Sequence, residues 1–195
     1  MFFQTVGCSV IRGESMGIAK QAGISLLEWM TVLAIVAIGS GSALPLLDRS
    51  LERQRLRGHG LALLGSLQYA RAEALRRNQP VYLCAANLKR NRELQGCLPP
   101  QAGPQAVWPE GALVYADRGA GNGYYDSGER LKLAMFDGAR VAVRAPARQL
   151  TLTAEGRLRE AGAMVFRLSG GRQCLALTLA EDGRARLGEV SDDCG

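Results

Sequence analysis

The sequence has little of what metal and catalytic sites are commonly built from. Its 195 residues include a single histidine, His59, and no Cys-x-x-Cys pair, so no zinc site is predicted. The acidic residues are scattered through turns, and no serine lies in an evident His/Asp setting, which removes the usual groups for acid–base or nucleophilic work. We therefore expect no enzymatic activity, no metal and no other cofactor.

Charge is also nearly absent from one long segment. Between Ile24 and Leu47 the only charged side chain is Glu28, and a helix of this length could cross a bilayer. A bare carboxylate costs at least about 2.5 kcal/mol at the centre of a span, so Glu28 needs a partner. Cleavage after Gly23 would supply one, because the new α-amino group would lie about a helical turn away, in the same subunit or in a neighbour.

A plain membrane anchor or an ordinary secretory signal is the alternative interpretation. Gly41-Ser42-Ala43 resembles a signal-peptidase site, but the early carboxylate and the helical pattern that continues beyond it disfavour this. Residues 1–23 are interpreted as a polar leader, and translation could begin at Met16. With either start, Lys20 is expected to stay on the cytoplasmic side.

One apolar stripe predicts that the next part is an amphipathic helix. Its members recur at spacings of seven, four, three and four residues: Leu56, Leu63, Leu67, Ala70 and Ala74. Asn78 and Pro80 end the pattern. We expect one helix from about residue 24 to residue 77, whose second half lies against a globular domain. Glycines and Pro45 predict a kink or a melted segment near residues 39–45.

Four cysteines follow the proposed cut, and Cys8 precedes it. An even number of cysteines beyond a membrane indicates two disulfides, and four cysteines allow three connectivities. We favour Cys84–Cys97 and Cys174–Cys194, because each pair closes a short local loop. The alternative is four free thiols in a cytosolic domain.

The chain after Pro80 changes to short apolar runs separated by glycine, proline and polar turns, as in an antiparallel β domain. The expected strands are Val81–Ala85, Ala112–Ala116, Leu131–Phe136, Arg140–Arg144, Leu150–Thr153, Met164–Leu168, Cys174–Leu179 and Arg184–Val190. The segment Asn87–Pro109 is expected to be a surface loop tied by Cys97. Residues 117–129 carry oxygen ligands that suit calcium, but their spacing departs from the EF-hand loop, so a glycine-rich connection is favoured.

The proposed cleavage junction resembles that of the type IV pilins and of the pseudopilins of type II secretion. It reads Ala22-Gly23-Ile24-Ser25-Leu26-Leu27-Glu28. From Gly23 to Glu28, the family typically has Gly, Phe, Thr, Leu, Ile and Glu at the same six positions. The resemblance implies cleavage after Gly23 by a prepilin peptidase and N-methylation of Ile24. It also implies that Glu28 guides the subunit into the filament and that Pro45 is the family's kinking proline. Ile24 and the bulky Trp29 depart from the usual pattern.

A second resemblance narrows the assignment. The segment from Leu67 to Arg77, followed by Pro80-Val81-Tyr82-Leu83-Cys84, resembles the GspH/FimT group of minor pilins and pseudopilins. It implies an α+β, type IV pilin-like fold in which a long N-terminal helix packs on an antiparallel β-sandwich. The expected parts are a leader (1–23), a transmembrane assembly helix (24–47), an amphipathic helical half (48–79) and an extracytoplasmic β domain (80–195).

We accordingly expect a minor pilin of the type IV pilus, inserted in the filament or its tip to prime assembly and to support adhesion, twitching motility or DNA uptake. The alternative is a minor, GspH-like pseudopilin of a type II secretion system. The implied partners are other major and minor pilins, the prepilin peptidase, an inner-membrane assembly platform and membrane lipid. The protein would be a single-pass inner-membrane protein with a periplasmic domain before it enters the filament. The net charge of +6 also permits DNA contact, for which Lys89, Arg90 and Arg92 are the candidates.

Overall fold

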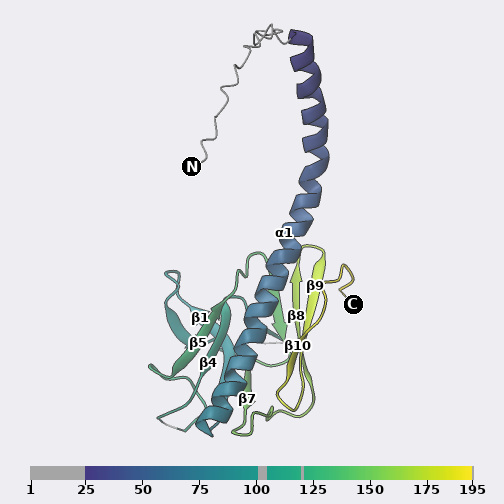
Figure 1. The fold of residues 1–195 in the computed structure, drawn as a ribbon. Helices are drawn as coiled ribbons and strands as arrows, with labels where there is room; N and C mark the ends of the chain where they lie inside the picture. Colours follow the sequence, from purple (N-terminus) through teal and green to yellow (C-terminus); the bar gives the residue numbers. More distant parts are fainter. Residues whose placement is uncertain (1–24, 101–104, 120, 195) are drawn as a thin grey trace, which may run out of the picture. The chain divides into compact units, whose positions relative to one another are not determined.

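The computed structural model describes residues 25–100, 105–119 and 121–194, and the side chains of residues 40–47 lie outside this description (Figure 1). The chain divides into two compact units, residues 1–44 and residues 45–195. A single helix, α1 (Leu26–Arg77), contributes to both units.

Helix α1 begins and ends as its sequence predicts. The carbonyl oxygen of Ser25 accepts the first hydrogen bonds, from the backbone N–H groups of Glu28 (3.0 Å) and Trp29 (3.1 Å). At the other end Asn78 has a φ of 52°, and the N–H of Gln79 donates to the carbonyl of Ala74 (3.3 Å). This is a Schellman arrangement, in which a left-handed residue closes the last turn.

The helix continues without a break through residues 39–45, so the melted segment expected there is not found. Among the residues that the structure describes, no helix combines the length and apolarity needed to span a bilayer. The predicted span 24–47 includes residue 24 and the side chains of residues 40–47, which lie outside the description.

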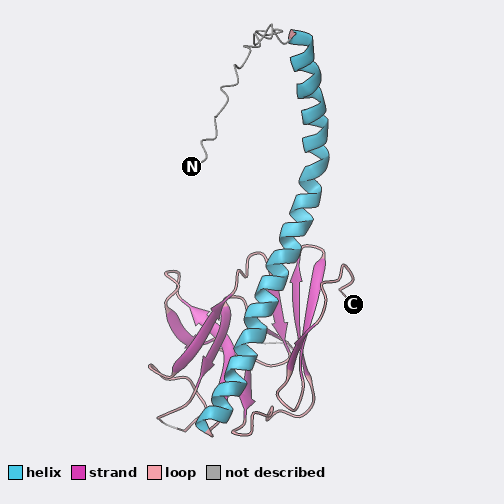
Figure 2. Ribbon diagram, viewed as in Figure 1, coloured by secondary structure: helices cyan, strands magenta, loops and turns pink. Residues whose placement is uncertain are grey.

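Two five-stranded sheets form the β domain, and every strand pair is antiparallel, which confirms the predicted fold class (Figure 2). The first sheet has the order β2-β1-β4-β5, with β7 beside the first half of β1. Its strands are β1 (Val81–Leu88), β2 (Leu94–Cys97), β4 (Gly111–Tyr115), β5 (Arg130–Met135) and β7 (Gln149–Leu152). The second sheet has the order β10-β9-β8-β6-β3. Its strands are β3 (Ala106–Val107), β6 (Ala142–Ala145), β8 (Met164–Gly170), β9 (Gln173–Leu179) and β10 (Ala185–Leu187).

The expected surface loop Asn87–Pro109 was wrong in part, because it contains β2 and β3. Strand β2 returns along β1 in a hairpin, with a register shift between Asn87 and Leu88 and a tight turn in which Arg92 has a φ of 63°. These strands have only four and two residues, which is too short for sequence periodicity to reveal them. The strand expected at Arg140–Arg144 begins at Ala142, because the carbonyl of Asp137 first closes a turn.

The main core lies between the second half of α1 and both sheets. All five stripe residues are fully buried, as the spacing predicted: Leu56, Leu63, Leu67, Ala70 and Ala74. Trp108 and Phe166 meet edge to face at 5.5 Å in this core, and the indole Nε1 donates to the carbonyl of Ala147 (3.2 Å). Burying each leucine contributes about 1.5–3 kcal/mol, so the stripe helps to hold the helix on the β domain.

Candidate functional site

The first described part of α1 is apolar on all sides, and all its side chains are exposed within the single chain. Its large hydrophobic side chains are Leu26, Leu27, Trp29, Met30, Val32, Leu33, Ile35, Val36 and Ile38. A helix that is hydrophobic all round is normally buried, either in a membrane or among other helices. An apolar surface of this extent therefore marks a site of association.

Glu28 is the single charged residue on this helical surface between residues 25 and 39. It lies in the first turn of α1, where the positive end of the helix dipole favours a carboxylate. The hydroxyl of Thr31 donates to the backbone carbonyl of Glu28 (2.8 Å). Gly23 and Ile24 lie outside the described residues, as does the side chain of Pro45.

Polar contacts as well as the apolar stripe join the second half of α1 to the β domain. Lys132 of β5 donates to the carbonyl of Gly65 (3.1 Å), and its ammonium lies 5.5 Å from the ring centre of Tyr69. Arg71 Nε donates to the carbonyl of Gly156 (3.1 Å) in the β7–β8 connection. This half of the helix is thus fixed to the β domain.

An ion-pair cluster closes the C-terminal end of α1. The carboxylate of Glu73 accepts hydrogen bonds from Arg76 (2.7 Å) and Arg77 (2.5 Å). These hydrogen bonds lower the pKa of Glu73 from 4.5 to about 2. The positive charges of the two arginines are also stabilising at this C-terminal end, which is the negative end of the helix dipole. Glu73 was not among the residues singled out from the sequence, although its spacing of three and four residues from the arginines is a recognisable signal.

The four predicted cysteines form two disulfides in the structure. Cys84 of β1 is joined to Cys97 of β2, with 5.7 Å between their Cα atoms. Cys174 of β9 is joined to Cys194 in the C-terminal segment, with 5.4 Å between their Cα atoms. These are the two local pairs that the sequence favours. The first fixes the hairpin missed in the expected loop, and the second ties the chain end to the second sheet.

A tyrosine cluster covers the first disulfide on the outer face of the first sheet. Tyr82 stacks on Tyr115 at 5.2 Å, and Tyr125 meets Tyr115 edge to face at 5.5 Å. The hydroxyl of Tyr115 donates to the carbonyl of Gly123 (2.8 Å), and burial raises its pKa above the ordinary value. The cluster anchors the β4–β5 connection against the sheet.

This connection, residues 117–129, uses its carboxylates for backbone hydrogen bonds. Asp117 accepts from the N–H groups of Gly121 (3.0 Å) and Gly123 (2.7 Å), and the bond from Gly123 is the main cause that lowers its pKa. Glu129 accepts from the N–H groups of Arg118 (2.8 Å) and Asp126 (2.9 Å). The carboxylates of Asp117 and Glu129 thus have backbone partners, and the described residues contain no cluster of metal-ligating side chains.

The candidates for DNA contact lie at the β1–β2 hairpin. Lys89, Arg90 and Arg92 are all exposed. The ammonium of Lys89 pairs with Glu93 at 3.1 Å, so part of this positive charge is neutralised locally. The same hairpin borders a pocket with the half-buried His59, whose pKa is lowered by burial.

Comparison with known proteins yields two family matches. Residues 61–183 match the model of the type II transport protein GspH, and residues 18–44 match the prokaryotic N-terminal methylation motif. No curated protein matches the chain. The second match includes Gly23, Ile24 and Glu28, on which the interpretation of the junction depends.

The chain is similar to two solved structures of one protein, the type IV minor pilin FimU of Pseudomonas aeruginosa strain PAO1, and the first of them shares its fold. The first is 22% identical, covers 74% of this chain and 98% of its own, and has a TM-score of 0.50. The second is 19% identical, covers 71% and 99%, and has a TM-score of 0.48. The GspH model covers more than half of the sequence, and the fold is that of a pilin. The chain therefore belongs to the GspH family, with a prokaryotic N-terminal methylation motif ahead of the family domain.

Proposed function

We propose that this protein is a minor pilin of the type IV pilus, which enters the filament or its tip and helps to prime assembly. The observation that carries the proposal is an apolar helix, exposed in the single chain, that continues into a helix fixed on a disulfide-bonded β domain. Association with other pilins would bury that surface, while the β domain would face outward. Pilin and pseudopilin families are structural, so the role proposed for the chain is assembly.

Processing would prepare the helix for assembly. A prepilin peptidase would cleave after Gly23, and Ile24 would become the N-methylated terminus. The new amino group would then lie about one turn from the Glu28 carboxylate, in the same or a neighbouring subunit. Pairing these charges would remove the cost of a lone carboxylate among apolar helices. The methylation motif across residues 18–44 supports this route.

Before assembly the protein would be held in the inner membrane by residues 24–47, with residues 80–195 in the periplasm. Residues 48–79 would form the amphipathic half of the helix, and Pro45 would let the two halves adjust to each other. Other major and minor pilins and the inner-membrane assembly platform would then be its partners. Disulfides in the β domain are consistent with an oxidising compartment.

The second candidate is a minor pseudopilin of a type II secretion system. The observation that favours it is the matching family model, which is described as a type II transport protein. The physical mechanism would be the same, because the helix, the carboxylate and the β domain are shared. The two candidates differ in the filament that the subunit joins.

Deletion of the gene, with two readouts, tests the proposal. We expect loss of surface pili with normal secretion of extracellular enzymes, and restoration of pili by the wild-type gene. Loss of secretion with normal pili would support the second candidate instead. Normal piliation together with normal secretion would contradict both.

A further inference from the structure

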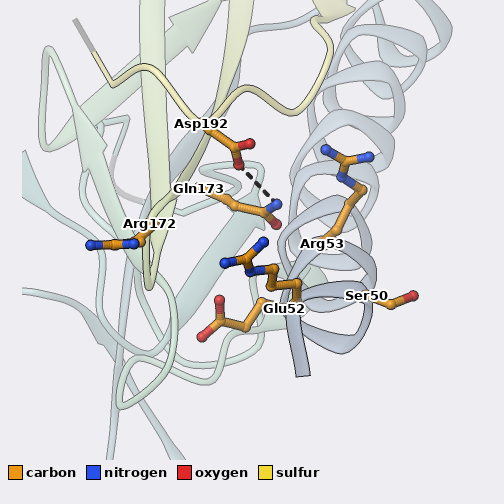
Figure 3. A pocket seen from close by; sticks show the side chains of 7 residues that line it. Ser50, Glu52, Arg53, Arg172, Gln173 and Asp192 are labelled. Carbon is orange, nitrogen blue, oxygen red and sulfur yellow. Dashed lines mark hydrogen bonds between the residues drawn. The ribbon is translucent and has the colours of Figure 1, made fainter. Parts of the chain in front are cut away.

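An open pocket of about 810 Å³ lies between the start of the packed part of α1 and the second sheet. Its lining residues are Arg49, Ser50, Glu52, Arg53, Arg172, Gln173 and Asp192 (Figure 3). All of them belong to the compact unit of residues 45–195. The volume is in the range of pockets that hold small ligands.

The pocket combines charges of both signs that are not paired with each other. Among the described residues, no carboxylate forms a salt bridge with Arg49 or Arg53, the two arginines supplied by α1. Glu52 and Asp192 add two carboxylates. Arg172 is exposed at the margin and extends away from α1 in Figure 3. A ligand that carries only a negative or only a positive charge would complement either the arginines or the carboxylates, but not both.

Gln173 supplies the observation that points to a ligand. Its side chain extends from the start of β9 toward α1, and only 6% of the residue is exposed. The amide Nε2 donates to Asp192 Oδ1 (3.0 Å), while Oε1 is buried without a hydrogen-bond partner among the described residues. Buried polar atoms are nearly always paired, so this acceptor has capacity for a donor in the pocket. Because Oε1 is itself covered, a donor reaches it only after the groups that cover it move.

We infer that this pocket binds a phosphoethanolamine headgroup of a membrane lipid. The guanidinium groups of Arg49 and Arg53 donate to the phosphate, a geometry that arginine favours. The ligand's ammonium donates to the carboxylate of Asp192 and to Oε1 of Gln173. Both ligand charges and the unpaired amide oxygen are then satisfied together.

The position in the chain supports a lipid as the source of this headgroup. Arg49 follows the apolar segment that ends at Leu47 by two residues on the same helix. If that segment lies in the membrane, as the proposed function holds, the first polar turn beyond it is at headgroup level. The inference rests on the proposed function in this respect. Binding here would orient the β domain at the membrane surface before the subunit leaves for the filament.

Native mass spectrometry of the full chain in a non-ionic detergent tests the inference. Equimolar dihexanoyl-phosphatidylethanolamine, -phosphatidylcholine and -phosphatidylglycerol compete for the protein. Phosphatidylcholine keeps the phosphate but has no ammonium hydrogen to donate, and phosphatidylglycerol has no cation. We expect phosphatidylethanolamine to bind about tenfold more strongly than either. Glycerophosphoethanolamine, which has no acyl chains, competes for the same site if the headgroup alone is recognised, and its failure to compete overturns the assignment.

Four variants locate the binding. Gln173→Leu and Asp192→Asn should each bring the ratio of phosphatidylethanolamine binding to binding of the other two lipids close to one. Because Asp192 is exposed, its variant should keep the fold. Arg53→Ala should weaken all three lipids, whereas Arg90→Ala, an exposed arginine outside the pocket, should change nothing. Equal binding of the three lipids, stronger binding of phosphatidylglycerol, or an unchanged preference in Asp192→Asn would overturn the inference. Because the readout is lipid binding, such a result with normal piliation rejects the pocket and leaves the pilin proposal standing.

Discussion

A Cβ atom on Gly60 would lie 2.5 Å from the Cδ2 atom of Leu175, so any side chain at this position of α1 would require the Leu175 side chain of β9 to shift. The same Cβ would lie 2.9 Å from Leu187 Cδ1 in β10. This glycine therefore sets the distance at which the second half of α1 packs on the second sheet.

Replacing Gly60 with valine should lower the free energy of unfolding by about 1–3 kcal/mol, because overpacking forces the helix or the leucines to move. Gly58→Val is the matched control, because it lies on the same helix and a Cβ atom added there would meet no atom within 4 Å. Both variants gain the same helix propensity relative to glycine. Urea unfolding followed by circular dichroism measures the difference; equal stabilities would contradict the close packing.

The ion pairs of Glu73 predict a specific acid dependence. The folded pKa of about 2 is below the ordinary 4.5, so the stabilisation is fully present above pH 4.5 and is lost as the pH falls toward 2. Because Arg76 is largely exposed, we expect Glu73→Gln to cost only about 1 kcal/mol at pH 7. The difference from wild type should shrink below pH 4.5 and disappear as the pH falls through 2. A difference that is constant across this range would contradict the assignment.

The connection 117–129 should be held by its own amides without calcium. Calorimetric titration of the protein with calcium should give no binding heat, and Asp117→Ala should lower the melting temperature because the N–H groups of Gly121 and Gly123 lose their acceptor. Asp182→Ala is a suitable control, since its carboxylate accepts from a single backbone amide at an exposed turn. Saturable calcium binding that Asp117→Ala removes would restore the metal interpretation.

Glu28 should be required for assembly and dispensable for folding. We expect Glu28→Leu to accumulate in the membrane but to fall at least tenfold in sheared filaments, because the methylated terminus loses its counterion. Glu28→Asp keeps the charge and should retain more incorporation. Immunoblots of membrane and filament fractions measure both. Wild-type incorporation of Glu28→Leu would contradict the pairing.

The features that could be predicted from the sequence are those with a strong local pattern. The spacing of Leu56, Leu63 and Leu67 gave the buried face of α1, and Asn78 with Pro80 gave its end. The paired strands of the sheets were also anticipated where apolar residues alternate or run together.

Features that depend on long-range contacts could not be predicted in this way. Strand β2 exists because Cys97 and its neighbours pair with the end of β1, and Gly60 packs against leucines more than 100 residues away. Gln173 resembles any polar residue at the start of a strand until the fold buries its amide beside Asp192. A linear pattern does not record which distant segments meet, and these contacts decide burial and pairing.

Mass spectrometry of the amino terminus of the mature protein, recovered from sheared filaments, tests the central claim most directly. The account predicts a first residue of Ile24 carrying one N-methyl group. A mature chain that begins at Leu44, or one that retains residues before Ile24, would contradict it.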